Sequence, residues 1–287
     1  MAEYTVDSLL ALVTSIQHKT PDARVRTIVN RIVSDLFRTI DELDIQPAEF
    51  WAAVDWLSEA GRNGELGLVT AGLGLDRLLD IRMDLADRAK GLAGGTPRAI
   101  EGPLYIAGAP ESAGLARLDQ EADEGSVLLM QGRVTDHRGQ PIANATVDVW
   151  HANSKGRYSH FDDQQQPYNL RRRIRTDGNG EYRYRTLVPS GYGVPPGSAT
   201  DRLMSALGRH GERPAHIHYM AYADGFQALT TQINLPGDQY LDDDFAFATR
   251  DELVVALEHH SDPAQIAAEG LDAPFYTSRF DIVLNPA

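Results

Sequence analysis

The sequence contains no cysteine, no long apolar run and no excess of positive charge. The lack of cysteine excludes disulfides, thiolate metal ligands and cysteine nucleophiles. No stretch approaches the roughly 18 uninterrupted apolar residues of a membrane span, and residues 1–6 show no basic region followed by an apolar run. We therefore expect no membrane span, no secretory signal and a cytoplasmic location.

The charge balance is acidic. Lys and Arg number 27 against 41 Asp and Glu, a formal net charge of −14, whereas phosphate contacts need clustered cations. A solvated or ion-paired edge explains the densest basic run, residues 171–173, better than a phosphate-binding patch. The sequence thus predicts no nucleic-acid partner. With 42% hydrophobic and 24% charged residues over 287 positions, it is typical of a globular protein of one large or two modest domains.

Apolar residues in the N-terminal third have the spacing of amphipathic helices. Between residues 25 and 40 they recur at i, i+3, i+4 and i+7, and Thr20-Pro21-Asp22 before them is a reasonable helix start. Similar patterns predict further helices near residues 6–16, 47–61 and 75–88.

Beyond a linker rich in glycine at residues 91–97, the apolar period changes to two. Short strands separated by turn sequences at 136–141 and 176–180 predict a β-sandwich. The expected strands are residues 127–134, 146–150, 182–185 and 280–284, with short helices near 199–207 and 252–259.

The most informative stretch is Arg213-Pro-Ala-His-Ile-His-Tyr219. On a β-strand, residues two apart point to the same face, so His216 and His218 would present two imidazoles to one metal ion. An isolated His-x-His pair indicates a structural pair of strand histidines equally well.

Tyrosines supply the other candidate ligands. Tyr192 lies in a turn of glycines and prolines at residues 189–196, and Tyr158 follows the apolar strand that ends at residues 150–153. Tyr168, ten residues after Tyr158, competes as the second phenolate. Imidazoles and phenolates without thiolates suit a hard, oxidised metal, which indicates a non-haem ferric site.

Several segments in one order carry a family resemblance. The chain resembles the intradiol ring-cleavage dioxygenases, and within them the catechol-cleaving enzymes. The resemblance covers nearly the whole chain. The matching segments are residues 72–76, 79–84, 100–110, 149–153, 158–162, 169–173, 207–211, 213–219, 229–233 and 243–250.

The resemblance implies an α+β fold. Residues 1–98 would form a helical N-terminal dimerisation and linker domain, and residues 99–287 an all-β sandwich that holds the metal. It also implies a homodimer through the N-terminal helices, whose apolar tunnel can hold a phospholipid. The periodicity alone shows only amphipathic helices, so the dimer and the lipid come from the resemblance.

The family's metal site is carried onto four residues. The resemblance implies one Fe(III) per subunit, held by Tyr158, Tyr192, His216 and His218, and it favours Tyr158 over Tyr168. Tyr192 and His218 take the axial positions, and Tyr192 leaves the metal to accept a substrate proton. Tyr158 and His216 take the staying equatorial positions.

Two further residues take catalytic roles in the family. Arg213 matches an arginine beside the substrate ring, where a guanidinium stabilises developing negative charge; an ordinary ion pair is its alternative role. Gln232 matches a glutamine that supports this arginine and the oxygen pocket. Among the remaining histidines, His210 is the best candidate for a position next to the ligands.

The resemblance also implies a substrate pocket lined by apolar residues. This lining favours an unsubstituted ring and leaves no cation for a ring carboxylate. Ala71 replaces the bulkier proline of some relatives, which predicts tolerance of a methyl or chloro group at the ring 4-position. The lining residues are Leu68, Ala71, Ile100, Pro103, Leu104, Phe245 and Ala246.

The implied function is Fe(III)-dependent intradiol cleavage of catechol with O2 to cis,cis-muconate, in the degradation of aromatic compounds. A hydroxyquinol or chlorocatechol dioxygenase with the same iron site is the nearest alternative. A metal-free β-sandwich binding module and a Zn or Cu hydrolase or oxidase are further alternatives, the last disfavoured because no acidic ligand lies near the histidines.

Overall fold

The computed structural model describes residues 4–92, 94–121 and 123–287. Contacts group the chain into two compact units, Met1–Asn63 and Gly64–Ala287. Helices α4 (Leu66–Gly72) and α5 (Leu75–Ala89) therefore belong to the same unit as the strands. The predicted domain boundary between residues 98 and 99 stays a prediction.

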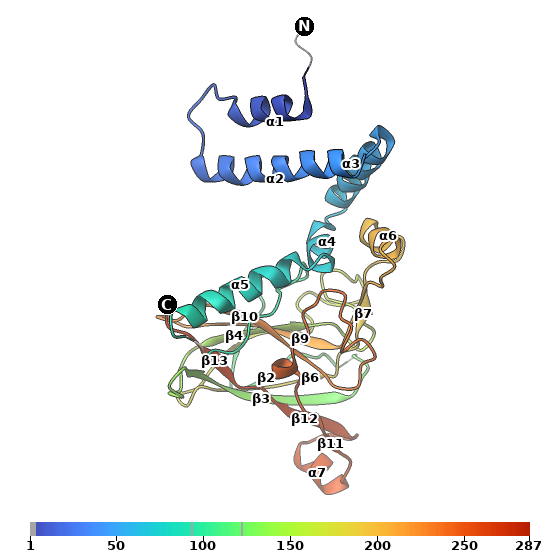
Figure 1. The fold of residues 1–287 in the computed structure, drawn as a ribbon. Coiled ribbons are helices and arrows are strands. Elements are labelled where there is room, and N and C mark those ends of the chain that lie inside the picture. Colours follow the sequence, from blue (N-terminus) through green and yellow to red (C-terminus); the bar gives the residue numbers. More distant parts are fainter. Residues whose placement is uncertain (1–3, 93, 122) are drawn as a thin grey trace. The chain divides into compact units, whose positions relative to one another are not determined.

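The first unit consists of amphipathic helices, as predicted. Asp22 caps α2 by accepting a hydrogen bond from Val25 N, and Pro47 occupies the first turn of α3, where a missing N–H costs nothing. Figure 1 shows α1 alongside α2. No described residue of α1 or α2 is buried, so their apolar faces stay exposed. The helices are α1 (Val6–Ser15), α2 (Ala23–Glu42) and α3 (Pro47–Arg62).

The second unit is built on two β-sheets, which confirms the predicted α+β fold (Figure 1). One sheet has the order β1 (Glu111–Ala113), β5 (Arg171–Arg175), β4 (Thr146–His151), β9 (His216–Tyr222) and β10 (Leu229–Asn234). The other has the order β11 (Glu258–His260), β12 (Phe275–Arg279), β3 (Val127–Asp136), β6 (Glu181–Leu187) and β2 (Leu115–Arg117), with β13 (Ile282–Leu284) also paired to β3.

Short elements decorate the sheets. They are the β7–β8 ribbon (Tyr192–Gly193 and Glu212–Arg213), α6 (Ala199–Ala206), α7 (Pro263–Ala268) and the 3-10 turn η1 (Asp251–Leu253). No helix in the described part of the chain is long and apolar enough to cross a membrane.

The prediction of a helix near residues 252–259 is wrong. Only η1 forms there, followed by extended chain and then β11. The β-branched Val254 and Val255 run beside β10, where Val255 N donates to Asn234 O at 3.1 Å. Pairing with a neighbouring strand therefore overrides the helix-like pattern.

The core lies between the two sheets. Val147 and Ile217 of the first sheet are buried with Leu128 of the second, in one apolar cluster. Tyr184 and Tyr219 join the sheets through hydroxyls 2.5 Å apart. Because side chains alternate along a strand, the residues next to Ile217 point to the opposite face of β9, and these are His216 and His218.

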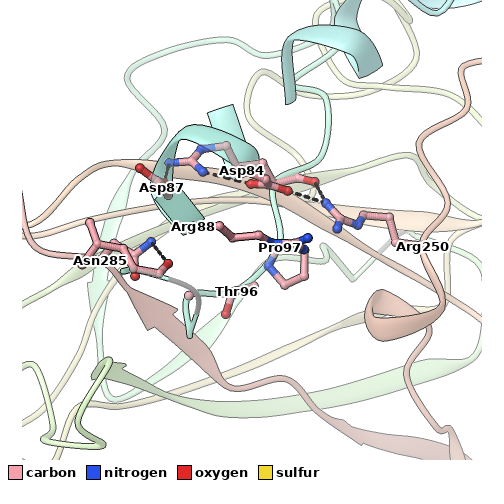
Figure 2. Close-up of a pocket in the computed structure, with 10 residues that line it drawn as sticks. Asp84, Asp87, Arg88, Thr96, Pro97, Arg250 and Asn285 are labelled. Atoms are coloured by element: carbon pink, nitrogen blue, oxygen red, sulfur yellow. Dashed lines mark hydrogen bonds and ion pairs between the residues drawn. The ribbon is translucent and has the colours of Figure 1, made fainter. Parts of the chain in front are cut away.

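Ion pairs attach α5 to the rest of its unit. Arg98 lies 2.9 Å from the Asp84 carboxylate and 2.7 Å from that of Asp87, and Arg250 lies 2.8 Å from Asp84. Figure 2 shows Asp84 of α5 facing Arg250. All four side chains are largely buried, so these pairs are less screened than surface pairs and fix the position of the helix.

Candidate active site

Strand β9 presents its two histidines together on one face. It lies between β4 and β10, with His218 opposite both Trp150 and Gln232. The Nε2 atoms of His216 and His218 are 3.1 Å apart, and each residue is 1% exposed. The Trp150 ring stacks on His218 at 4.8 Å between centroids and fixes its orientation. Both imidazoles are thus buried and held in place.

The β7–β8 ribbon brings Tyr192 to this pair. Tyr192 lies opposite Arg213 in the ribbon, and its Oη is 3.5 Å from His216 Nε2. Glycine is required beside it, because a Cβ at Gly191 would come within 2.5 Å of Arg213 O. The turn residues around Tyr192 therefore permit a close approach of two backbones.

Tyr158 completes the group. Its Oη is 3.4 Å from His216 Nε2, and its ring packs edge-on against Tyr192 at 5.4 Å. The competing tyrosine lies elsewhere: Tyr168 donates from its hydroxyl to Ala107 O at 3.0 Å. The fold thus brings Tyr158, and not Tyr168, to the histidines.

The protonation of these groups suits a metal. Burial, with the Arg213 charge as a second cause, lowers the pKa of His216 to about 3, and burial lowers that of His218 well below its ordinary value. Both imidazoles are therefore neutral. His216 Nδ1 donates to Pro214 O at 2.6 Å, which leaves its Nε2 lone pair for a ligand bond.

The tyrosines point to a cation of high charge. Burial raises the pKa of Tyr158 well above its ordinary value, so the phenol is ionised only beside a strongly acidic metal. Among the described residues, no group of three His, Asp or Glu side chains could hold a metal. Tyr158 and Tyr192 are the further oxygen donors beside the two histidines, and a set of two imidazoles and two phenols fits a ferric ion.

Arg213 belongs to a buried hydrogen-bond network at the same place. Its Nη1 is 3.0 Å from His216 Nε2, and its Nη2 donates to Gln232 Oε1 at 2.9 Å. Asp244 pairs with the other side of the guanidinium, at 3.1 Å from both Nε and Nη2. Arg213 is thus ion-paired and also adjacent to the candidate ligands. Gln232 contacts Arg213, and its supporting role in the reaction stays a prediction.

The predicted lining residues fall into two groups. Leu68, Ala71, Ile100, Phe245 and Ala246 belong to one apolar cluster, to which α4 and the chain after Asp244 contribute.

Pro103 and Leu104 contact other residues than this cluster does. Pro103 adjoins α4, since a Cβ at Gly67 would be 3.1 Å from Pro103 Cβ. Leu104 packs with Trp150 and Tyr158, beside the candidate ligands. That all seven residues face a substrate stays a prediction.

Two residues with a bearing on the site are absent from the sequence prediction. Asp244 ends a run of three aspartates, which alone indicates a solvated acidic surface. Arg209 donates to Gly72 O at 2.7 Å and to Phe245 O at 3.1 Å, and so ties α4 to the chain around Phe245. Its segment, 207–211, gave a signal only as part of the family resemblance.

His210, the neighbour chosen from that segment, has other contacts. Its Nδ1 accepts from Glu212 N at 3.0 Å, and its Nε2 lies 3.0 Å from Asp243. The described contacts of His210 do not include the four candidate ligands.

The basic run 171–173, predicted to be solvated or ion-paired, is so only in part. Arg173 lies 3.9 Å from Glu111, but Arg171 is 1% exposed. Its guanidinium lies 5.6 Å from the centroid of the Tyr158 ring and donates to Ser159 Oγ at 2.9 Å. Arg171 therefore contacts a face of the Tyr158 ring and a neighbouring side chain at the candidate site.

Comparisons with known proteins identify the family of the chain. A family model described as "Dioxygenase" matches residues 100–286, and one described as "Catechol dioxygenase N terminus" matches residues 22–91. Catechol 1,2-dioxygenase 2 of Acinetobacter lwoffii is 56% identical over 90% of this chain and 94% of its own. A chlorocatechol 1,2-dioxygenase of Pseudomonas putida is 33% identical over 81% of this chain and 86% of its own.

The structural comparison gives the same result. The crystal structure of wild-type Acinetobacter radioresistens catechol 1,2-dioxygenase matches with a TM-score of 0.94 and 50% identity, over 98% of this chain and 92% of that one. The chain belongs to the intradiol ring-cleavage dioxygenase family, as the resemblance predicts, and is an enzyme of its catechol 1,2-dioxygenase type.

Proposed function

We propose that this enzyme cleaves catechol with O2 between the two hydroxyl-bearing carbons, giving cis,cis-muconate. One Fe(III) per subunit would be held by Tyr158, Tyr192, His216 and His218. The observation that carries the proposal is the convergence of the other three donors on His216 Nε2, each within 3.5 Å of it. Bound there, a ferric ion would supply the Lewis acidity that holds phenols and catechol in their deprotonated forms.

The two tyrosines differ in a way that suits different roles. Tyr158 is 3% exposed, whereas Tyr192 is half-buried on a two-residue ribbon. We assign to Tyr192 Oη the acceptance of one catechol proton, and to Tyr158 a constant place among the ligands. His216, with its Nδ1 bonded to Pro214 O, also keeps its position.

Arg213 would act on the ring. Its guanidinium is buried, stays cationic and reaches the ligand side through Nη1. A fixed cation in a water-poor site stabilises negative charge that develops on a ring carbon. Gln232 holds Nη2 and thereby limits the rotation of the guanidinium.

The product test is direct. Purified, iron-loaded enzyme is given catechol under ¹⁸O2, and the product is identified by NMR and mass spectrometry. We expect cis,cis-muconate with one labelled oxygen in each carboxylate. A semialdehyde from cleavage outside the diol, or no consumption of O2, would refute the proposal. Less than about one iron per subunit with full ligand binding would favour the metal-free binding module.

The apolar lining supports a preference for simple catechols. Leu68, Ala71 and Phe245 belong to an apolar cluster, and such side chains favour an unsubstituted ring over one that carries a carboxylate or a third hydroxyl. The small side chain of Ala71 supports tolerance of a substituent at the ring 4-position. Turnover of catechol, 4-methylcatechol and 4-chlorocatechol tests this, and negligible rates on both substituted rings would contradict it. Faster turnover of hydroxyquinol than of catechol would make the alternative dioxygenase class the better assignment.

The N-terminal helices support a proposal about assembly. Ile32 is 53% exposed and Leu36 54%, and a groove lies between α1 and α2, lined by Val6, Leu9, Phe37 and Ile40. We propose that these helices form a homodimer and hold a phospholipid on their apolar faces. Light scattering and mass spectrometry of an organic extract test both parts. A monomer at all concentrations would contradict the first, and an extract without lipid the second.

A further inference from the structure

Asp244 lies directly behind the guanidinium of Arg213. Its two carboxylate oxygens accept from Arg213 Nε and Nη2, both at 3.1 Å, in the two-pronged arrangement that fixes the plane of a guanidinium. Arg213 is 4% exposed and Asp244 6%. Each charge is therefore balanced chiefly by the other, since little water reaches either group.

The same carboxylate also orders the chain that follows it. Asp244 Oδ1 accepts from Ala246 N at 3.1 Å, and Oδ2 accepts from Ala248 N at 3.3 Å. The turn between them holds Phe247 at a φ of 55°, a conformation that needs such support in a residue other than glycine. Phe245 and Ala246, both in the apolar cluster, are thus tied to the position of Asp244.

The bonds to Asp244 and Gln232 leave the Nη1 side of Arg213 facing the candidate ligands. Of the five N–H donors of the guanidinium, two point to Asp244 and one to Gln232, so the two on Nη1 remain. Nη1 lies 3.0 Å from His216 Nε2, on the ligand side. The orientation of Nη1 toward the reacting groups therefore depends on Asp244.

We propose that Asp244 is a positioning residue of the reaction. It aims Arg213 Nη1 at the substrate ring. Through the backbone of Ala246 and Ala248, it also holds the apolar wall, meaning the cluster that contains Ala71, Phe245 and Ala246, at a fixed distance from that guanidinium. The inference rests on the proposed function, because it assigns to Arg213 a part in the cleavage of catechol. Beyond that function, it assigns two tasks to the Asp244 carboxylate: orienting the guanidinium of Arg213 and positioning the apolar wall.

A double-mutant cycle separates positioning from mere structural support. The variants are Asp244→Asn, Arg213→Gln and the two combined. Asp242→Asn is the matched control, because it removes an exposed carboxylate from the same acidic run. For each, iron content, the visible spectrum, kcat and KM for catechol are measured on the iron-loaded enzyme.

We expect Asp244→Asn to lower kcat for catechol about 100-fold, the size of effect that a misplaced catalytic group produces. Iron content and spectrum should match the wild type, since no ligand is changed, and Asp242→Asn should keep wild-type rates. In the Arg213→Gln background, the second substitution should cause no further loss, because the group that Asp244 positions is gone.

Other outcomes would overturn the inference. Wild-type kcat in Asp244→Asn would show that Arg213 needs no positioning, and losses that multiply in the double variant would show that Asp244 acts independently. If Asp244→Asn fails to fold with its unpaired buried arginine, the charge-balanced double variant is compared with Arg213→Gln alone. Equal kcat in these two variants would support the inference, and a lower kcat in the double variant would overturn it. A wild type that leaves catechol uncleaved would instead refute the proposed function.

Discussion

At the scale of single residues, burial changes the chemistry of polar side chains around the site. The imidazoles of His216 and His218 are neutral, and the phenol of Tyr158 resists ionisation, because water cannot solvate their charged forms. The imidazoles are thus ready to bind a metal, whereas the phenol binds as phenolate only when the metal is strongly acidic. The same residues on an exposed surface would keep pKa values near their ordinary ones and would lack this preference for a strongly acidic metal.

Tyr158→Phe tests the choice of tyrosine. Removing one hydroxyl removes a donor, so we expect iron affinity to fall by more than the ~10–100-fold that loss of a ligand's supporting partner costs. Tyr168→Phe is the matched control, since its hydroxyl bonds to Ala107 O instead. Iron is measured after dialysis against a chelator. Retention by Tyr158→Phe together with loss by Tyr168→Phe would reverse the assignment.

Asp148 gives a prediction about pH. Burial raises its pKa to about 6 from an ordinary value of 3.8, although Tyr105 donates a hydrogen bond to it at 2.9 Å. The folded protein therefore binds this proton more tightly than the unfolded chain does. The stability that the neutral carboxyl contributes is complete below about pH 4 and is lost as the pH rises through about 6.

Asp148→Asn stays neutral and should escape that loss. Its free energy of unfolding, relative to the wild type, should rise between about pH 4 and pH 7 in urea titrations, following the shift of the Asp148 pKa. Asp163→Asn removes an exposed carboxylate and should run parallel to the wild type. A constant difference between Asp148→Asn and the wild type across this range would contradict the account.

The sequence reveals residues of the site unevenly. His216 and His218 are predictable because their spacing on a strand forces them to one face. Choosing Tyr158 over Tyr168 required the family resemblance, since both follow the same strand. Asp244 was not predictable, because a carboxylate in a run of three gives no sign of which one is buried.

At the scale of elements, the spacing of apolar residues predicts a helix or strand correctly where the element's own residues determine its structure. The amphipathic spacing in α2 and the alternation in β3 are of this kind. Residues 252–259 fail because their conformation depends on pairing with β10, which lies elsewhere in the sequence. Helix α4 has too few turns to show a period, although it carries two of the predicted lining residues.

Arg209 holds two elements of the pocket wall together. Its guanidinium bonds to the carbonyls of Gly72 and Phe245, and so sets the separation of α4 from the chain around Phe245. Arg209→Met should cost about 1–3 kcal/mol of stability, since hydrogen bonds from a charged donor are lost. Without these bonds, α4 and the chain around Phe245 can move apart. The added space should raise the ratio of kcat/KM for 4-methylcatechol to that for catechol.

An exposed arginine on α6 provides the comparison. Arg202 bonds to Gly197 O at the start of its own helix, and Arg202→Met should leave the substrate ratio unchanged. Thermal unfolding and steady-state kinetics on both substrates give the measurements. An unchanged ratio in Arg209→Met, with stability lowered, would limit Arg209 to a structural role.

At the scale of the whole molecule, the site depends on parts that are distant in sequence. The candidate ligands come from the 153–158 turn, the β7–β8 ribbon and β9. The apolar cluster beside them comes from α4 and from the chain after Asp244. Family motifs in one order along the chain predict this assembly as a set. The amphipathic N-terminal helices predict a covered apolar face but leave its partner open, because periodicity contains no information about what binds there.

The central claim is that Tyr158 and Tyr192 bind a ferric ion that catechol then reaches directly. The most direct measurement is the visible absorption spectrum of the iron-loaded enzyme, before and after catechol is added without oxygen. We predict a broad tyrosinate-to-iron band that moves to longer wavelength with catechol. A colourless protein after ferric loading, or a band unchanged by catechol, would contradict the account.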